Sequence, residues 1–147
     1  MKIGVIRYPG TNCFYDTINY FGKDNCIEIW HKNDKMPNID LLIIPGGVKA
    51  LEYLRQQTNA LKFISEWNEK GKVIGCICHG AQLLISAKIT KGRDVSGYYS
   101  IKDDIENSGA NYVDGPAVVS DNLVTCPHYK WMGQWMNKVI EIYNTKN

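Results

Sequence analysis

A short apolar run that leads directly into a cysteine and a small-residue turn constrains this chain most. Residues 73–77 have the pattern of a β-strand, a Cys-His-Gly turn follows, and residues 82–87 have the pattern of a helix. A sharp strand-to-helix turn lifts one side chain above the end of a sheet, and small residues two positions before and after it leave room for the turn. Cys76 and Gly80 occupy those positions. The segment therefore predicts a nucleophile elbow with Cys78 at its tip.

The predicted elbow places the Cys78 thiol at the start of a helix. Free N–H groups and the helix dipole favour a thiolate there. A cysteine at the end of an apolar strand can also be an ordinary core residue, because free cysteine is among the most buried residue types. The neighbouring His79 and Gly80 favour the reactive alternative. We expect Cys76, in contrast, to face the other side of the strand and to belong to the core.

Strands and helices alternate along the first part of the chain. Strand patterns occupy residues 2–8, 26–30, 41–44 and 72–77. Helix patterns occupy residues 12–21, with Thr11 or Asn12 as N-cap, and residues 51–70, in two pieces broken near residues 58–59. Continuous apolar strands that alternate with helices favour a parallel sheet covered on both faces. Functional sites in such sheets lie beyond the carboxyl ends of the strands.

The second part of the chain predicts shorter elements. Strands are expected at residues 94–97, 111–113, 117–120 and 123–126, and helices at residues 101–108 and 129–143. Asp121-Asn122 is a hairpin-turn pair between the last two strands. The last helix carries an apolar stripe that is expected to be core or dimer surface. Its members are Trp131, Met132, Trp135, Met136, Val139 and Ile140.

Length, charge and cysteine spacing exclude several classes of protein. The 147 residues fit one domain over residues 1–147. A net charge of +2 gives no reason to expect a nucleic acid or an anionic membrane as partner. No apolar run approaches the roughly 20 residues of a membrane span, and we expect no signal peptide at the N-terminus. The five cysteines show no metal-binding spacing, so we expect a reduced cytoplasmic protein without a cofactor or metal.

The elbow and the residues after it resemble the ThiJ/PfpI family over residues 72–125. The resemblance rests on Ile77-Cys78-His79-Gly80-Ala81-Gln82-Leu83-Leu84-Ile85-Ser86-Ala87, Lys91-Gly92-Arg93, Ile101-Lys102-Asp103-Asp104 and Gly109-Ala110-Asn111-Tyr112-Val113-Asp114. The first part is similar to the glutaminase subunit of formylglycinamidine ribonucleotide synthase, a class I glutamine amidotransferase. That similarity rests on Tyr8-Pro9-Gly10-Thr11-Asn12-Cys13, Trp30-His31-Lys32, Pro45-Gly46-Gly47 and Glu52-Tyr53-Leu54-Arg55. Both resemblances imply one α/β fold, a flavodoxin-like sandwich with a mainly parallel central sheet and helices on both faces.

The resemblance also implies roles for individual residues. Cys78 is the nucleophile in both families, and the ThiJ/PfpI pattern makes His79 its partner. The family pattern also has an acidic residue as the third member of the catalytic group, which some relatives contribute across a subunit interface. Glu52 lies near that place, but one more residue separates it from the glycine pair than in the PfpI pattern. The Gly46-Gly47 turn suits an oxyanion site, with the backbone N–H groups of Gly47 and His79 as donors.

Two departures from the family patterns bear on the reaction. Many relatives carry a glutamate just after the first strand, whereas this chain has Asn12 in that region, which weakens a deglycase or glyoxalase assignment. Glutaminases use a late histidine that is followed two residues later by glutamate. Here His128 is followed by Lys130, so a glutaminase would lack its orienting acid.

Three functions follow as hypotheses. The first is a cysteine-dependent hydrolase or amidase of PfpI type, acting through Cys78 on a small amide, carbonyl adduct or peptide. The second is a non-catalytic redox or stress-sensing protein whose thiol is oxidised. The third is a glutaminase component with a degenerate triad, in which His128 assists Cys78 and a synthase is the partner. A homo-oligomer is expected, and neither a nucleic acid nor a membrane is an expected partner.

Overall fold

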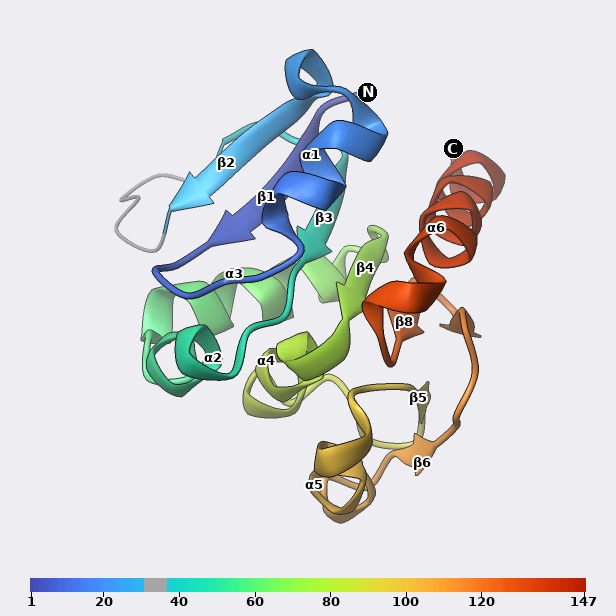
Figure 1. Ribbon diagram of the computed structural model, residues 1–147. Helices are drawn as coiled ribbons and strands as arrows, with labels where there is room; N and C mark the ends of the chain where they lie inside the picture. Colours follow the sequence, from blue (N-terminus) through green and yellow to red (C-terminus); the bar gives the residue numbers. More distant parts are fainter. Residues whose placement is uncertain (31–36) are drawn as a thin grey trace.

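The computed structural model describes residues 1–30 and 37–147, and its centre is a six-stranded sheet (Figure 1). The quoted residues His31 and Lys32 lie outside the described residues. The strands are Ile3–Arg7 (β1), Cys26–Trp30 (β2), Leu41–Ile44 (β3), Ile74–Ile77 (β4), Asp94–Val95 (β5), Asn111–Tyr112 (β6), Val118–Ser120 (β7) and Leu123–Cys126 (β8). The α-helices are Phe14–Phe21 (α1), Val48–Leu54 (α2), Thr58–Glu69 (α3), Ala81–Ser86 (α4), Lys102–Asn107 (α5) and Met132–Lys146 (α6).

The strand order in the main sheet is β2-β1-β3-β4-β8-β7. Every neighbouring pair is parallel except β7 and β8, which form an antiparallel hairpin. β5 and β6 form a separate two-stranded sheet. The predicted flavodoxin-like fold with a mainly parallel sheet is therefore confirmed. In this arrangement the carboxyl ends of β1, β3 and β4 lie side by side, and their loops meet at one edge.

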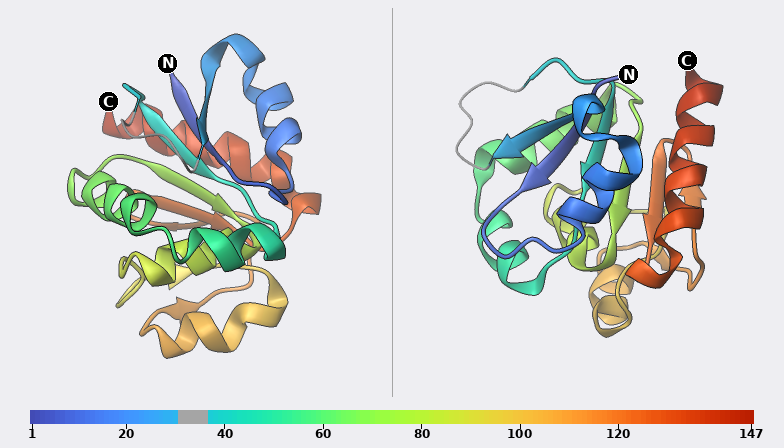
Figure 2. Two further views of the ribbon diagram at one scale, coloured as in Figure 1. Left: turned by 90° about the vertical axis from the view of Figure 1, so that its left-hand side faces the viewer. Right: turned by 45° about the horizontal axis from the view of Figure 1, so that its top comes forward.

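Helices cover both faces of the sheet (Figure 2). On one face α1 and α6 pack against a cluster that includes Val5, Ile43 and Trp135. On the other face α2, α3 and α4 pack against a second cluster that includes Leu42 and Ile74. Each fully buried Ile, Leu or Val contributes about 1.5–3 kcal/mol to folding relative to an exposed side chain. The two clusters explain why the strands have nearly continuous apolar sequences.

The predicted stripe of the last helix is part of this core. Trp135, Met136 and Val139 are buried, and Trp131, Met132 and Ile140 pack against the same cluster while remaining half-buried. The indole N–H of Trp135 donates a hydrogen bond of 3.0 Å to the carbonyl oxygen of Val124. This bond satisfies the one polar group that Trp135 takes into the core. The stripe therefore covers the sheet within one chain.

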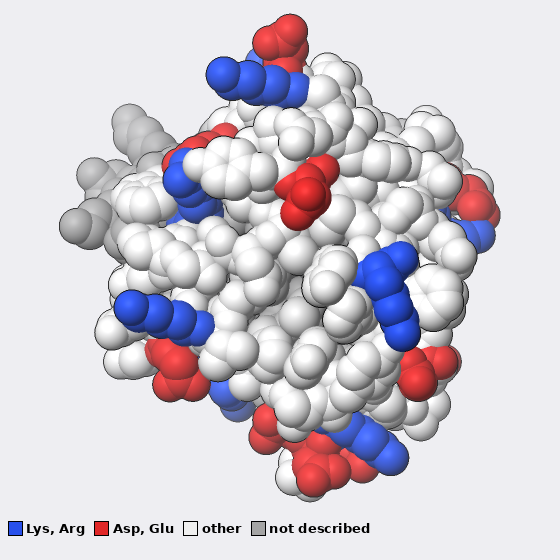
Figure 3. All heavy atoms as spheres, viewed as in Figure 1, with Lys and Arg blue, Asp and Glu red and all other residues white. Residues whose placement is uncertain are grey.

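Charged side chains of both signs are scattered over the face shown in Figure 3, and they form no large patch of one sign there. The formal net charge is +2. Among the described residues no helix has the length and apolar character of a membrane span. The charges of this face therefore give no indication of a polyanionic partner.

The starts of three helices differ by two or three residues from those predicted. α1 begins at Phe14 with Cys13 as its N-cap, because Thr11 is held in a turn by its N–H and Oγ1, which both donate to Tyr8 O, at 2.9 and 3.0 Å. The helical region after β3 starts at Val48, directly after the glycine pair. Its two helices are separated at residues 55–57, just before the predicted break near residues 58–59. The last helix is preceded by a short 3-10 turn, so α6 starts three residues later than expected.

Candidate active site

Cys78 stands at the sharp turn between β4 and α4. Its φ of 61° lies in the left-handed region, which costs a non-glycine residue roughly 1–2 kcal/mol. A Cβ atom on Gly80 would lie 2.9 Å from Cys76 Sγ and from the carbonyl oxygens of Ile44 and Pro45, so only glycine fits there. Cys76 packs on the opposite face of the sheet from Cys78, as predicted. The strained backbone and the close packing are those of the predicted elbow.

The turn after β3 lies against the Cys78 side chain. A Cβ atom on Gly46 would be 2.9 Å from Cys78 Cβ and 3.4 Å from its Sγ, and equally 2.9 Å from Asn12 Oδ1. The N–H of Asn12 donates to Gly46 O at 3.1 Å, which fixes the loop after β1 on this turn. Gly47 has a φ of 117°, a conformation that glycine adopts most readily. The structure thus brings Asn12 and the glycine pair together with the thiol.

His79 is the imidazole in contact with the thiol. Its Nδ1 lies 3.5 Å from Cys78 Sγ, and its Nε2 lies 3.4 Å from Ser100 Oγ. If Nε2 carries the proton, the thiol can donate to Nδ1 while Nε2–H donates to Ser100 Oγ. This tautomer satisfies both contacts and leaves Nδ1 ready to accept the thiol proton. The side chains of Cys78, His79 and Ser100 are therefore connected in a row within one chain.

Burial acts on both members of the Cys78–His79 pair. It raises the pKa of the Cys78 thiol, which is 9% exposed, and the backbone N–H of His79 opposes this rise through its hydrogen bond to the sulfur. Burial also lowers the pKa of the His79 imidazole. The uncharged thiol and imidazole are therefore favoured over the ion pair near neutral pH. The expectation of a thiolate stabilised by the helix start is wrong for this buried site, because desolvation outweighs the N–H contact.

Tyr98 packs on His79, and the sequence predicted neither Tyr98 nor Ser100 as a neighbour of the thiol. The ring of Tyr98 stacks on that of His79 with centroids 4.7 Å apart and an interplanar angle of 26°. The Tyr98 N–H donates to Cys78 O at 3.2 Å, so the segment after β5 is joined to the elbow. The only signal in the sequence is a polar, aromatic turn after a short strand, and its closeness to Cys78 depends on the tertiary fold.

His128 is placed differently from His79. Its Nδ1 accepts a hydrogen bond of 3.1 Å from the Lys130 N–H, and its ring packs on Tyr129 with centroids 4.2 Å apart. Tyr98 lies parallel to it at 6.1 Å. Within the described residues no hydrogen bond joins His128 to Cys78. The imidazole that contacts the Cys78 thiol is therefore that of His79, whereas His128 packs in an aromatic cluster with Tyr98 and Tyr129.

Glu52 lies on the exposed side of α2. Its backbone carbonyl accepts a hydrogen bond of 2.8 Å from the Gln56 side chain. In the part of the chain that the structure describes, its carboxylate makes no contact with Cys78 or His79. Within a single copy of the chain, the side chain that contacts His79 Nε2 is therefore Ser100 and not Glu52.

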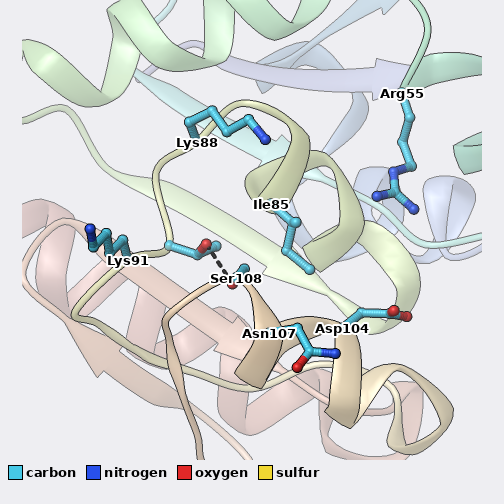
Figure 4. Close-up of a pocket in the computed structure, with 8 residues that line it drawn as sticks. Arg55, Ile85, Lys88, Lys91, Asp104, Asn107 and Ser108 are labelled. Carbon is cyan, nitrogen blue, oxygen red and sulfur yellow. Dashed lines mark hydrogen bonds between the residues drawn. The ribbon is translucent and has the colours of Figure 1, made fainter.

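A pocket of about 430 Å³ lies at the far end of α4 from the elbow (Figure 4). It is lined by Arg55, Ile85, Lys88, Thr90, Lys91, Asp104, Asn107 and Ser108. Two internal hydrogen bonds of 2.8 Å, from Arg55 Nε to Ser86 Oγ and from Thr90 Oγ1 to Ser108 Oγ, hold its walls. The pocket contains no cysteine or histidine. This pocket therefore offers neither a thiol nor an imidazole, in contrast to the elbow at Cys78 and His79.

Comparison with known proteins agrees with this geometry. A model of the DJ-1/PfpI family matches residues 22–142. Deglycase PfpI of Pyrococcus furiosus is 36% identical over 103 residues, which are 70% of this chain and 61% of that protein. General stress protein 18 of Bacillus subtilis is 44% identical over 89 residues, 60% of this chain and 51% of that protein. The chain thus matches only about half to three fifths of the length of these curated relatives.

Solved structures show the same fold. DJ-1 of Schizosaccharomyces pombe matches with a TM-score of 0.81 at 20% identity, over 99% of this chain and 96% of that one. A ThiJ/PfpI domain protein from Brachyspira murdochii matches with a TM-score of 0.82 at 16% identity, over 98% and 96% of the two chains. Since the family model covers most of the sequence, the chain belongs to the DJ-1/PfpI family.

Proposed function

We propose that the protein is a cysteine-dependent hydrolase in which Cys78 attacks the carbonyl carbon of a small amide, carbonyl adduct or peptide. The observation that supports this most directly is the contact of 3.5 Å between Cys78 Sγ and His79 Nδ1, beside the Gly46-Gly47 turn. A nucleophile, a base within reach and an adjacent backbone turn are the components that acyl transfer needs.

The proposed reaction begins from the uncharged pair. As Cys78 Sγ bonds to the carbonyl carbon, its proton passes to His79 Nδ1, and the imidazolium is stabilised by Nε2–H donating to Ser100. The carbonyl oxygen becomes an oxyanion beside the glycine pair, where the N–H of Gly47 is the proposed donor. For an amide or peptide, collapse of the tetrahedral adduct breaks the C–N bond and returns the proton from Nδ1 to the leaving amine, and water then hydrolyses the thioester to a carboxylic acid and the free thiol. For a carbonyl adduct of an amine, Cys78 Sγ instead displaces the amine from the adduct carbon, the amine takes the proton from Nδ1, and the resulting hemithioacetal releases the carbonyl compound and the thiol.

Carbonyl adducts of amines are the substrates that we test first because of the names of the relatives, although the absence of the usual glutamate after the first strand counts against them. Relatives of this chain are named deglycase, including deglycase PfpI and protein/nucleic acid deglycase 2 of Escherichia coli, which is 40% identical over 87 residues. Asn12 provides a neutral amide next to the thiol where many relatives carry a carboxylate. A neutral neighbour adds no charge that would oppose an oxyanion or a thiolate at this site.

The test measures turnover of a set of substrates by the wild-type chain. Adducts of methylglyoxal with N-acetylated amino acids, simple anilide amides and short peptides represent the three classes. Cys78→Ser and His79→Ala are expected to lose turnover, whereas Cys26→Ser on the edge strand β2 is the matched control and should keep it. The hydrolase proposal is wrong if no member of the set is turned over, or if Cys78→Ser remains fully active.

We also propose that a second copy of this chain completes the site. The carboxylate of Glu52 is exposed on α2, where a neighbouring copy can reach it. Sedimentation velocity should then show a dimer or larger assembly, and Glu52→Gln should lower kcat in the assembled protein. Gln56→Glu, one turn further along the chain, serves as a control for the charge of this surface. A strictly monomeric active protein would contradict the proposal.

A further inference from the structure

The pocket at the far end of α4 has the size of a small-molecule site. Its volume of about 430 Å³ lies toward the lower end of the range of about 300–1,000 Å³ that ligand pockets have. The segments directly after α2 and α4 and the last turn of α5 form its walls. None of its lining residues contacts the thiol of Cys78 or the ring of His79. A ligand bound there would therefore be held by contacts other than those of the proposed substrate.

The lining of this pocket is positively charged. It contains three cationic side chains, Arg55, Lys88 and Lys91, and one carboxylate, that of Asp104. Over residues 1–30 and 37–147, none of the three cations takes part in a salt bridge. The lining thus has a formal charge of +2 that no protein group neutralises. Positive charge of this kind in a hollow attracts anionic ligands.

The side chain of Arg55 is fixed in a position from which it can bind an anion. It is half-buried, and its Nε donates a hydrogen bond of 2.8 Å to Ser86 Oγ at the end of α4. Its terminal N–H groups donate to no acceptor among the described residues. Figure 4 shows the guanidinium turned into the pocket, on the side that carries Asp104. Two parallel N–H groups of a guanidinium match two oxygens of a phosphate.

Lys88 has a strained backbone at this pocket. Its φ of 63° is left-handed, and glycine is the residue that favours this position after a helix. The last carbonyls of α4 are already bonded by backbone groups, since the N–H groups of Lys88 and Ile89 donate to Ile85 O and Leu84 O. The lysine side chain is therefore not needed to cap the helix. Strain that serves no purpose in the fold concentrates at functional sites.

The two cations lie on one side of the pocket and the uncharged polar group on the other. In Figure 4 the ammonium of Lys88 and the guanidinium of Arg55 lie on the same side of Ile85, and Asn107 lies across from them. A phosphate between Arg55 and Lys88 would contact both, while Lys91 lies farther away and adds to the positive field.

The opposite wall can recognise hydroxyl groups. The hydroxyl of Thr90 donates to Ser108 Oγ at 2.8 Å, and that of Ser108 donates to Ile105 O at 2.6 Å, so both protons are used within the wall. The carboxylate of Asp104 and the amide of Asn107 make no side-chain hydrogen bond in the described part of the chain. An unpaired carboxylate accepts hydrogen bonds from hydroxyls, and an amide both donates and accepts them.

We propose that this pocket binds a small sugar phosphate or polyol phosphate. Its phosphate contacts Arg55 and Lys88, and its hydroxyl groups contact Asp104 and Asn107. A phosphate monoester carries a charge of about −1.5 to −2 at neutral pH, which matches the charge of the lining. Binding involves no covalent step and does not require the Cys78 thiol, so the site can exist even if the proposed hydrolase activity fails.

The experiment is isothermal titration calorimetry of the full chain. The probes are glycerol 3-phosphate, ribose 5-phosphate and glucose 6-phosphate, with inorganic phosphate and glucose for comparison. We expect at least one of the three esters to bind once per chain, about tenfold more tightly than inorganic phosphate, because hydroxyl contacts add to its affinity. Glucose should not bind. Cys78→Ser should bind the ester as the wild type does, which separates this site from the proposed function.

Three variants locate the bound phosphate. Lys88→Gly should weaken binding of the ester about tenfold, through loss of a charge-assisted hydrogen bond. Because this change also relieves the backbone strain, a folding defect would not explain the loss. Arg55→Gln removes a cation but keeps an N–H donor for Ser86, and should weaken binding more because two parallel bonds are lost. Lys62→Ala on α3 removes an exposed lysine outside the pocket and should bind as the wild type.

Asp104→Ala tests the hydroxyl contacts. It should weaken the ester while leaving inorganic phosphate bound equally or more tightly, since a carboxylate repels the phosphate but attracts the hydroxyls. Three results would overturn the inference. They are no binding of any of the three esters, an equal loss in Lys62→Ala and Lys88→Gly, and equal affinities for inorganic phosphate and the esters, which would indicate an adventitious ion only.

Discussion

The phenol ring of Tyr98 stacks on the imidazole of His79, and the Tyr98 N–H donates to the carbonyl oxygen of Cys78. One residue therefore contacts the base through its side chain and the nucleophile through its backbone. Tyr98→Leu should lower kcat by up to about tenfold, because an aromatic stack contributes about 0.5–1.5 kcal/mol. Tyr98→Phe keeps the ring and should remain near wild type. An equal loss in both variants would mean that the hydroxyl matters and the stack does not.

The acid limb of the activity profile should lie at a lower pH than the ordinary pKa of histidine. Burial lowers the pKa of His79 below its usual 6.5, and the base must be uncharged to accept the thiol proton. Activity should therefore be lost only as the pH falls below 6.5. The Ser100 oxygen accepts from Nε2–H and so stabilises the imidazolium form of His79. Ser100→Ala removes this acceptor, so the acid limb should move to still lower pH, with a several-fold loss of kcat. A limb at or above 6.5 would contradict the assignment.

The rate at which iodoacetamide alkylates Cys78 should increase steadily with pH. Burial raises the pKa of the Cys78 thiol, and only the thiolate alkylates rapidly. The rate should therefore be low at neutral pH and still rising at pH 9, the ordinary pKa of a thiol. Peptide mapping at each pH separates Cys78 from the other four cysteines. A fast, constant rate between pH 6 and pH 8 would show a preformed thiolate instead.

The fold and the elbow at Cys78 were predictable because they depend on short stretches of sequence. The elbow needs only an apolar strand, a cysteine and Gly80, all within eight residues, and the strand patterns depend on local periodicity. The pKa direction of Cys78 was not predictable, because it depends on how much protein surrounds the sulfur. Ser100 and Tyr98 were missed since they reach His79 through a loop about twenty residues along the chain.

The N-cap of α1 shows the same limit. Thr11 and Asn12 have side chains that commonly cap helices. Here a local turn to Tyr8 O holds Thr11, and a tertiary hydrogen bond from the Asn12 N–H to Gly46 O holds Asn12 in the preceding loop. That displacement is what brings Cys13 to the helix start and its backbone into the left-handed region. No local pattern indicates this, because the partner of the loop is the glycine pair after β3.

Gly46→Ala should inactivate the protein more than it destabilises it. The added Cβ would lie 2.9 Å from both Cys78 Cβ and Asn12 Oδ1, so one of them must move. Overpacking of this kind costs about 1–3 kcal/mol of unfolding free energy. Gly133→Ala is the matched control, because its added Cβ meets no atom within 4 Å and it lies in α6. The control should keep its activity, and its unfolding free energy should rise by up to about 1 kcal/mol. Equal turnover in the two variants would mean that the close packing of Gly46 against Cys78 and Asn12 does not matter for activity.

Lys88→Gly should stabilise the protein by about 1 kcal/mol, because Lys88 follows α4 with a φ of 63°. Its N–H donates to Ile85 O at 3.0 Å and the Ile89 N–H donates to Leu84 O at 3.2 Å, the bonding pattern of a helix end that favours glycine. Thermal unfolding should show a midpoint higher by about 2–4 °C. Lys88→Ala removes the same long side chain but keeps the Cβ, so it should show no such gain. If alanine and glycine stabilise equally, the cause is the lysine side chain and not the backbone conformation.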